Sequence, residues 1–139
     1  MSVLSESISI KTKGEGDARD ITGAVASLVE SSPLQSGIAT VFVPGSTGGV
    51  TTIEYEPGAV SDLGEVLEKI APRQAYYRHN ETWGDGNGYA HVRAAVLGPS
   101  LTVPFQNKAL MLGTWQQIIF IDFDNRSRSR TLIVHLIGE

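Results

Sequence analysis

After Gly98 and Pro99 the chain contains only strand-like segments, and this run limits the fold more than any other feature. The segments are rich in β-branched and aromatic residues, and turn residues separate them. They are Leu101–Phe105, Leu110–Leu112, Trp115–Phe123 and Thr131–Ile137. The pattern is therefore not a regular alternation of strands and helices, which favours an α+β fold over a doubly wound one. We expect the last two segments to pair as a long hairpin.

The chain before Gly98 mixes strands with helices. Alternation or β-branched runs predict strands at Val3–Lys11, Gly37–Val43 and Val50–Glu56, with a short one at Ala75–Arg78. Apolar spacing predicts helices from Asp20 or Thr22 to Ser31, from Asp62 to Ala71, and from His91 to Leu97. Asp62 and Glu65 resemble a capping box at the start of the second helix. The expected fold is α+β, with mostly antiparallel, sandwich-like packed sheets and two or three helices.

Length and composition place the chain among ordinary globular proteins. Its 139 residues fit a single domain spanning 1–139, with 41% hydrophobic and 19% charged residues. No apolar run is long enough to span a membrane, and the N-terminus does not resemble a signal peptide. Cysteine is absent, which excludes disulfides and thiolate metal sites. We expect a cytoplasmic protein that does not bind membranes.

The net charge of -4 argues against a nucleic-acid partner. The one basic cluster, Arg126, Arg128 and Arg130, alternates with serines in an expected turn. A solvated hairpin tip is the simpler interpretation. An anion-binding or inter-subunit patch is the alternative.

Most of the residues that can carry chemistry lie between His79 and Gln117. His79, Asp85 and His91 follow one another at intervals of six residues across a glycine-rich loop, so their side chains can converge. Two imidazoles and a carboxylate can ligate zinc or a similar divalent ion. They can equally form an acid/base pair oriented by the carboxylate, or fix the loop by hydrogen bonds. The spacing leaves all three roles open.

Two glycine-rich loops are candidate phosphate sites. Gly84–Gly88 leads into the expected helix at His91, where free amides and the helix dipole favour an anion, and Arg93 can join them. The loop Gly45–Gly49 offers the hydroxyls of Ser46 and Thr47 beside unhindered amides. Ordinary turns, with Asn87 as a capping residue, are the alternative for both. No complete phosphate-loop or dinucleotide fingerprint is present.

Other polar and aromatic residues are candidates for ligand contacts. Glu54 and Glu56 lie on one face of a strand, where they either share a site or face solvent. Trp83 and Trp115 have polar neighbours, among them Thr114 and Gln116. An indole can stack on a heteroaromatic ring whose edge an amide reads, although a core or subunit-interface role is commoner for tryptophan. His135, on the last strand, is interpreted as structural.

Three motifs together resemble a known family. They are the run GDGN with His91-Val92-Arg93, the segment Leu97–Pro104 and the segment Leu112–Gln117. Phe42–Pro44 and Thr52–Glu54 extend the likeness over nearly the whole chain. The combination is similar to the YjbQ-like proteins, which are commonly named secondary thiamine-phosphate synthase enzymes.

The resemblance implies an α+β fold of packed sheets, a homotrimer, and a phosphorylated small molecule as ligand. The implied reaction joins a hydroxymethylpyrimidine diphosphate to a thiazole phosphate, giving thiamine phosphate and pyrophosphate. The family's polar motif positions fall on His79, Asp85, Asn87, His91, Arg93, Ser100, Thr114 and Gln116. Loss of pyrophosphate calls for Mg²⁺ or another divalent metal held by carboxylates, for which Asp85 and Glu54 are the candidates.

Two departures from the family pattern bear on metal binding. Many relatives carry histidine at the positions of Gly45 and Tyr89, so this chain lacks two of their candidate metal ligands. A phosphate-accepting pocket is therefore favoured over a tightly held metal. Two further hypotheses remain: a non-catalytic, homo-oligomeric protein that binds a small molecule or metal, and a structural trimer whose polar motifs hold subunits together.

Overall fold

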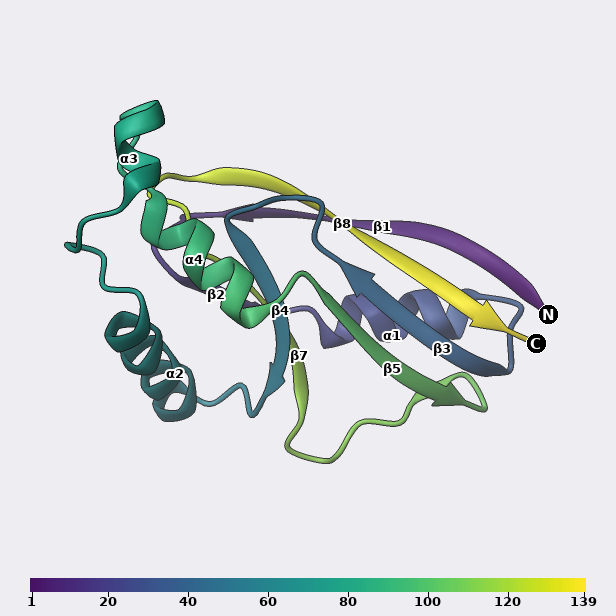
Figure 1. The fold of residues 1–139 in the computed structure, drawn as a ribbon. Coiled ribbons are helices and arrows are strands. Elements are labelled where there is room, and N and C mark those ends of the chain that lie inside the picture. The colour runs from purple at the N-terminus through teal and green to yellow at the C-terminus, as the bar shows by residue number, and fades with distance from the viewer.

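The computed structural model describes residues 1–139 and shows two antiparallel β-sheets packed face to face, with helices on the outside (Figure 1). Sheet A has the order β1(Ser2–Thr12), β8(Arg128–Gly138), β3(Ser36–Phe42), β5(Ser100–Gln106), β6(Ala109–Leu110). Sheet B has the order β2(Asp17–Asp20), β7(Gln117–Asp122), β4(Gly48–Ile53). The helices are α1(Thr22–Ser31), α2(Pro57–Ile70), α3(Arg78–Trp83) and α4(Gly88–Leu97). The expected α+β class is confirmed.

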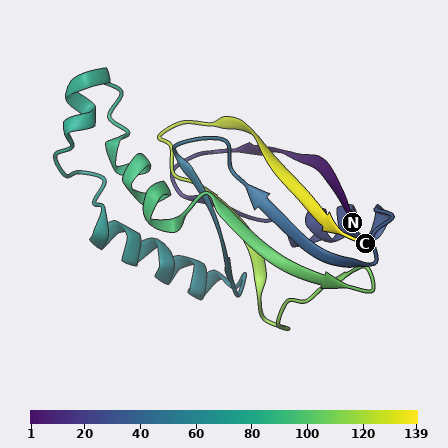
Figure 2. The same ribbon diagram turned by 45° about the vertical axis from the view of Figure 1, so that its right-hand side comes forward.

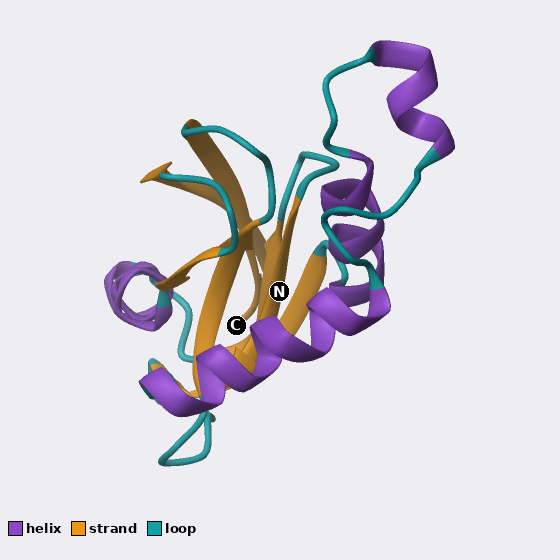
Figure 3. Ribbon diagram, turned by 90° about the vertical axis from the view of Figure 1, so that its left-hand side faces the viewer, coloured by secondary structure: helices purple, strands orange, loops and turns teal.

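Strand β7 contributes to two separate cores because both of its faces are buried. Ile118 and Phe120 point into the larger core, which lies between the sheets and takes in α1. Ile119 and Ile121 point into the smaller core beneath α2 and α4. Figure 3 shows the same layering, with α2 and α4 on the opposite side of the strands from α1. This double burial explains the continuous apolar run of β7.

Strand β8 is flanked by partners on both sides in sheet A. It pairs with β1 along its full length, from Ser2 opposite Gly138 to Thr12 opposite Arg128. Its other side pairs with β3. The two ends of the chain consequently lie side by side (Figure 1).

The expected hairpin between the last two strands is wrong. β7 pairs with β2 and β4 in sheet B, whereas β8 pairs with β1 and β3 in sheet A. The connection between β7 and β8 therefore crosses from one sheet to the other. Apolar runs identify strands but not their partners, which are set by contacts distant in sequence.

Several element boundaries differ from the expectation. α2 begins at Pro57, and proline suits the first helical turn. The side chain of Glu56 caps this helix by accepting hydrogen bonds from the amides of Gly58 and Ala59. The expected cap at Asp62 is therefore wrong. α4 begins at Gly88, before the expected His91. The region 75–78 forms no strand, and Arg78 instead opens α3, a helix that projects beyond the sheets (Figures 1 and 2).

None of the four helices is long and apolar enough to cross a membrane.

Candidate functional site

His79 and His91 meet between α3 and α4. Their ring centroids are 4.2 Å apart and the ring planes are inclined by 41°. α3 ends at Gly84, whose left-handed φ of 70° turns the chain back toward α4. The Gly88 amide then donates to Asn80 Oδ1 at 2.9 Å, which fastens the start of α4 to α3. The expected convergence of the two histidines is therefore observed.

Asp85 lies near this pair but is not bonded to it. Its Oδ1 is 3.9 Å from His79 Nδ1, beyond hydrogen-bond distance. His79 Nδ1 is buried and has no hydrogen-bond partner in the protein. No three histidine, aspartate or glutamate side chains are arranged to hold a metal ion. Because this chain does not by itself bring together a ligand set, we assign no chemical step to a metal.

His91 lies between two pockets. One pocket of about 450 Å³ is lined by Tyr76, Tyr77, Arg78, His79, Gly88, His91 and Val92. A smaller one of about 240 Å³ is lined by Gly45, Ser46, Gly48, His91, Ala94, Ala95 and Pro99. His91 is the only residue that belongs to both linings. A single imidazole can therefore contact molecules bound on either side.

The surroundings of His91 favour its neutral form. Burial lowers the pKa of the His91 imidazole below 6.5, and the neighbouring His79 lowers it further. Asp124 and Asp85 act in the opposite direction but do not reverse the shift. At pH 7 His91 is a neutral imidazole, which is the form that can accept a proton.

Two buried ion pairs stabilise the structure beneath the pockets. Arg128 donates to Asp124 Oδ2 from Nε at 2.9 Å and from Nη2 at 2.6 Å. Arg130 donates to Asp122 from Nε and Nη2, both at 2.8 Å. Both carboxylates are fully buried. The expectation of a solvated hairpin tip is therefore wrong for Arg128 and Arg130, which lie in β8, and only Arg126 is exposed in the turn.

The same network engages two of the expected ligand-binding residues. Thr47 Oγ1 donates to Asp124 Oδ2 at 3.1 Å and accepts from Arg130 Nη2 at 2.7 Å, so this hydroxyl is already occupied. Asn87 Nδ2 donates to Asp124 Oδ1 at 3.2 Å, while the buried Asn87 Oδ1 has no partner. Ser46, by contrast, is exposed and lines the smaller pocket. Ser100 is exposed beside Pro99 at the rim of that pocket.

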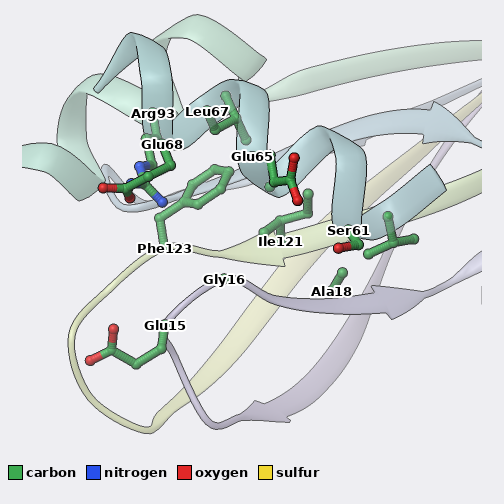
Figure 4. Close-up of a pocket in the computed structure, with 12 residues that line it drawn as sticks. Glu15, Gly16, Ala18, Ser61, Glu65, Leu67, Glu68, Arg93, Ile121 and Phe123 are labelled. Atoms are coloured by element: carbon green, nitrogen blue, oxygen red, sulfur yellow. The ribbon is translucent and has the colours of Figure 1, made fainter. Parts of the chain in front are cut away.

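Arg93 does not join the anion site expected at Gly84–Gly88. Its Nε donates to the Ala71 carbonyl at 3.0 Å, and its guanidinium pairs with Glu68 and lies 5.1 Å from the centre of the Tyr89 ring. Residues two apart on a helix point to nearly opposite sides, which separates Arg93 from His91. Figure 4 shows Arg93 beside Glu68 in a different pocket, of about 440 Å³, between α2 and sheet B. The expectation that Arg93 contacts the same anion is wrong; within this chain it fastens α2 to α4.

Four more expected ligand residues, Glu54, Thr114, Trp115 and Gln116, lie at the other end of sheet B. β4 runs from Gly48, which lines the smaller pocket with His91, to Ile53. A strand rises about 3.3 Å per residue, so the two ends of β4 lie roughly 17 Å apart. Gln116 Nε2 donates to Thr52 Oγ1 at 3.2 Å, and Trp115 is 72% exposed. Glu56 caps α2, so the two glutamates do not share a site. One chain therefore does not join these residues to the histidine pair.

Two residues at the larger pocket were missed by the sequence reasoning. Arg78 supplies a cationic side chain there, and Tyr76 supplies an exposed aromatic ring. Arg78 directly precedes His79 in the sequence, and Tyr76 lies three residues before it. Their position beside the first histidine was the available signal, and assigning the segment to a strand concealed it.

The fold and the site define a small α+β protein of two packed antiparallel sheets, with a two-histidine site between adjacent pockets. The chain belongs to the family described as UPF0047 protein YjbQ-like, which matches residues 6–139. A UPF0047 protein of Methanothermobacter thermautotrophicus is 37% identical over 139 residues, covering 100% of this chain and 95% of the relative. The UPF0047 protein YugU of Bacillus subtilis is 32% identical over 135 residues, covering 96% and 98%.

Solved structures show the same fold. A YbjQ-like protein of unknown function from Sulfolobus solfataricus superposes with a TM-score of 0.89 at 28% identity, covering 99% of this chain and 100% of that one. A yjbq/upf0047 family protein from Clostridium acetobutylicum gives 0.86 at 35% identity, covering 95% and 99%. These comparisons establish the family and the fold, and the reaction stays a prediction.

Proposed function

We propose that this protein is a transferase-like enzyme that acts on phosphorylated small molecules at the His79–His91 pair. The observation that carries the proposal is the place of His91, the only residue lining both pockets. A transfer reaction requires two molecules held side by side, with a group that stabilises the leaving group as the new bond forms. A neutral imidazole between two pockets can donate a hydrogen bond from its N–H to that leaving group.

Each pocket offers groups that suit a phosphate. Arg78 lines the larger pocket, and a guanidinium binds phosphate oxygens through two parallel hydrogen bonds. Ser46, Gly45 and Gly48 line the smaller pocket, where a hydroxyl and unhindered amides can receive a second anion. His79 also lines the larger pocket, where its ring can contact the bound molecule.

For the substrates we propose the pair that the family resemblance implies, a hydroxymethylpyrimidine diphosphate and a thiazole phosphate. A bond forms between the thiazole nitrogen and the pyrimidine methylene carbon, while the bond from that carbon to the diphosphate oxygen breaks and pyrophosphate leaves. The exposed ring of Tyr76 can stack on the pyrimidine. Of the two carboxylates expected to hold Mg²⁺, only Asp85 lies near the histidines, whereas Glu54 lies at the far end of sheet B, so one chain does not supply a complete Mg²⁺ site.

The test is formation of thiamine phosphate from the two precursors with Mg²⁺, measured by chromatography. His91→Ala should abolish the product, whereas Asp62→Ala, at an exposed position on α2, should retain it. Absence of product with the wild-type protein, or equal rates with and without His91, would overturn the synthase proposal. Pyrophosphate binding that depends on His91 without turnover would favour the alternative, a non-catalytic small-molecule-binding protein.

We also propose that copies of the chain assemble as a homotrimer through the outer face of sheet A. This face alternates with the buried core positions, and no helix is packed on it. Its outward residues include Val3, Ser5, Ser7, Ile38, Thr40, Phe42, Thr102, Ile133, His135 and Ile137. Among these only His135 is ionisable, and Lys11 lies on the same face at the far end of β1. The part of the face away from Lys11 can pack against a neighbouring copy without burying a fixed charge, which supports self-association.

The mass measured by analytical ultracentrifugation tests the trimer against a monomer of 14.9 kDa. Thr40→Arg places a charge at the centre of the face and should give monomers. Thr114→Arg, in an exposed loop far from that face, is the matched control and should leave the mass unchanged. A monomeric wild-type protein, or an unchanged assembly in Thr40→Arg, would contradict this interface.

A further inference from the structure

The segment 122–125, where β7 ends, contacts three separate parts of the site. Asp124 accepts from Thr47, which lies between two residues of the smaller pocket. It also accepts from Asn87, directly before Gly88 of the larger pocket. Asn125 Nδ2 donates to the Asp85 carbonyl at 2.7 Å. One short stretch of chain therefore connects the loops that surround His91.

Asp124 is built to accept from several donors at once. Its Oδ2 receives the Thr47 hydroxyl and two hydrogen bonds from Arg128, while its Oδ1 receives Asn87 Nδ2 and the Asn125 amide at 2.8 Å. The carboxylate is fully buried. Thr47 and Asn87 lie 77 and 37 residues away in the sequence, so this one side chain joins segments that are otherwise distant.

We propose that Asp124 is a positioning residue that fixes the two pockets on either side of His91 relative to each other, through Thr47 and Asn87. The inference rests on the proposed function of those pockets. Thr47 holds the smaller pocket's loop against β7, and Asn87 holds the start of α4, from which His91 extends one turn later. A transfer between two bound molecules depends on such a fixed separation.

Asp124 also fixes the orientation of the Asn87 side chain. A carboxylate only accepts hydrogen bonds, so the Asn87 amide must turn its Nδ2 toward Asp124. Asn87 Oδ1 is buried and has no hydrogen-bond partner in the protein, so the bond to Asp124 is the only one that holds this side-chain amide. Loss of the Asp124 carboxylate should therefore change the orientation of Asn87 at the start of α4.

Asp122 provides the matched control. It is as buried as Asp124, lies two residues away and also pairs with an arginine. Its side-chain partners are Thr12, Arg130 and the Asp124 backbone amide, and it hydrogen-bonds to neither Thr47 nor Asn87, although its partner Arg130 also donates to Thr47. Asp122→Asn and Asp124→Asn should both lower the melting temperature, because each weakens a buried ion pair. Only Asp124→Asn removes the direct acceptor of Thr47 and Asn87, so this variant should alter the site far more.

The experiment compares these two variants with the wild type in two measurements. Ligand-free ¹H–¹⁵N spectra report the Asn87 side-chain amide and the rings of His79 and His91. Calorimetric titration reports the affinity for inorganic pyrophosphate. In Asp124→Asn we expect the Asn87 amide and His91 signals to shift and the pyrophosphate affinity to fall at least about tenfold, because buried donors lose their acceptor. In Asp122→Asn we expect both readouts to stay close to wild type.

Matching spectra and affinities in the two variants would overturn the positioning role. A wild-type protein that binds no pyrophosphate would overturn the phosphate-pocket proposal instead, while the ligand-free spectra still decide the role of Asp124. Should Asp124→Asn fail to fold, Thr47→Val and Asn87→Leu each remove one of its connections. Each should then shift the His91 ring signals in a folded protein, and unchanged signals in both would overturn the inference.

Discussion

Tyr77 packs directly against Gly88, so that a β-carbon on residue 88 would come within 2.5 Å of the Tyr77 β-carbon. Such a distance is far inside van der Waals contact. The absence of a side chain at Gly88 therefore lets the segment leading into α3 lie against the start of α4. This close approach brings the rings of His79 and His91 together.

Gly88→Ala should consequently separate the two histidines and lower stability. The added methyl group forces Tyr77 away from α4, and we expect a cost of about 1–3 kcal/mol, as for other overpacked sites. Thermal unfolding and the ring signals of the two histidines in NMR spectra measure the two effects. Gly64→Ala is the control, because a β-carbon there meets nothing within 4 Å and should stabilise helix α2 by up to about 1 kcal/mol. Unchanged histidine signals in Gly88→Ala would contradict the steric argument.

Asp124 should make the protein sensitive to acid. Burial acts to raise the pKa of this carboxyl, but hydrogen bonds from Arg128, Asn87 and Asn125 outweigh it and lower the pKa to about 2. The group stabilises the fold above its unfolded pKa of 3.8, and this contribution, roughly 2 kcal/mol, is lost as the pH falls from about 4 to about 2. Denaturant unfolding across that range should show a smaller loss for Asp124→Asn than for the wild type. Equal losses would contradict the assignment.

His91 should titrate below the ordinary histidine range. Burial and then His79 lower its pKa from 6.5, so we expect an NMR titration midpoint under that value. His79→Gln should raise the midpoint part of the way, because burial remains. Since the folded state disfavours the proton, stability should decrease as the pH falls through 6.5. A midpoint at or above 6.5 in the wild type would remove the argument for a neutral imidazole at the site.

Arg93 should matter for stability rather than for phosphate binding. Arg93→Gln removes the ion pair with Glu68 and the contact with Tyr89, which connect α2 and α4. We expect a lower melting temperature and a pyrophosphate affinity within about twofold of wild type. A substitution far from a binding site usually changes the binding free energy by less than about 0.5 kcal/mol, which corresponds to about twofold in affinity. Arg78→Gln, at the larger pocket, should instead lower the pyrophosphate affinity and leave the melting temperature close to that of the wild type. Loss of binding in Arg93→Gln alone would restore the sequence-based expectation.

Much of the fold could be predicted because local patterns and burial agree. β1, α1 and β8 follow the expected alternation or helical spacing, since each buries one regular face. β2 was missed because its sequence, DARD, is short and polar and derives its structure from pairing with β7. α3 was missed because it buries no side chain and so carries no apolar stripe.

The site was predictable where neighbours in sequence converge and not where distant segments do. His79 lies in α3, His91 lies in α4 and Asp85 lies in the short loop between them, so chain reversal at that loop brings the three close. The separation of Gln116 from this site depends on the direction of β4 and β7 in sheet B, which no local pattern encodes. The sequence also contains a signal of the buried ion pairs. Asp122 and Asp124 lie two residues apart at the end of β7, and Arg128 and Arg130 lie two residues apart at the start of β8, so each aspartate can pair with one arginine.

The central position of β8 has a consequence for synthesis on the ribosome. The strand that joins β1 to β3 comes after all the other elements in sequence order, so sheet A cannot close until residues up to 138 have been synthesised. β1 has no other partner in the sheet and must wait until β8 has been made. A nascent chain would therefore expose an unpaired edge for longer than its small size suggests, and a chaperone that shields extended segments should improve its yield.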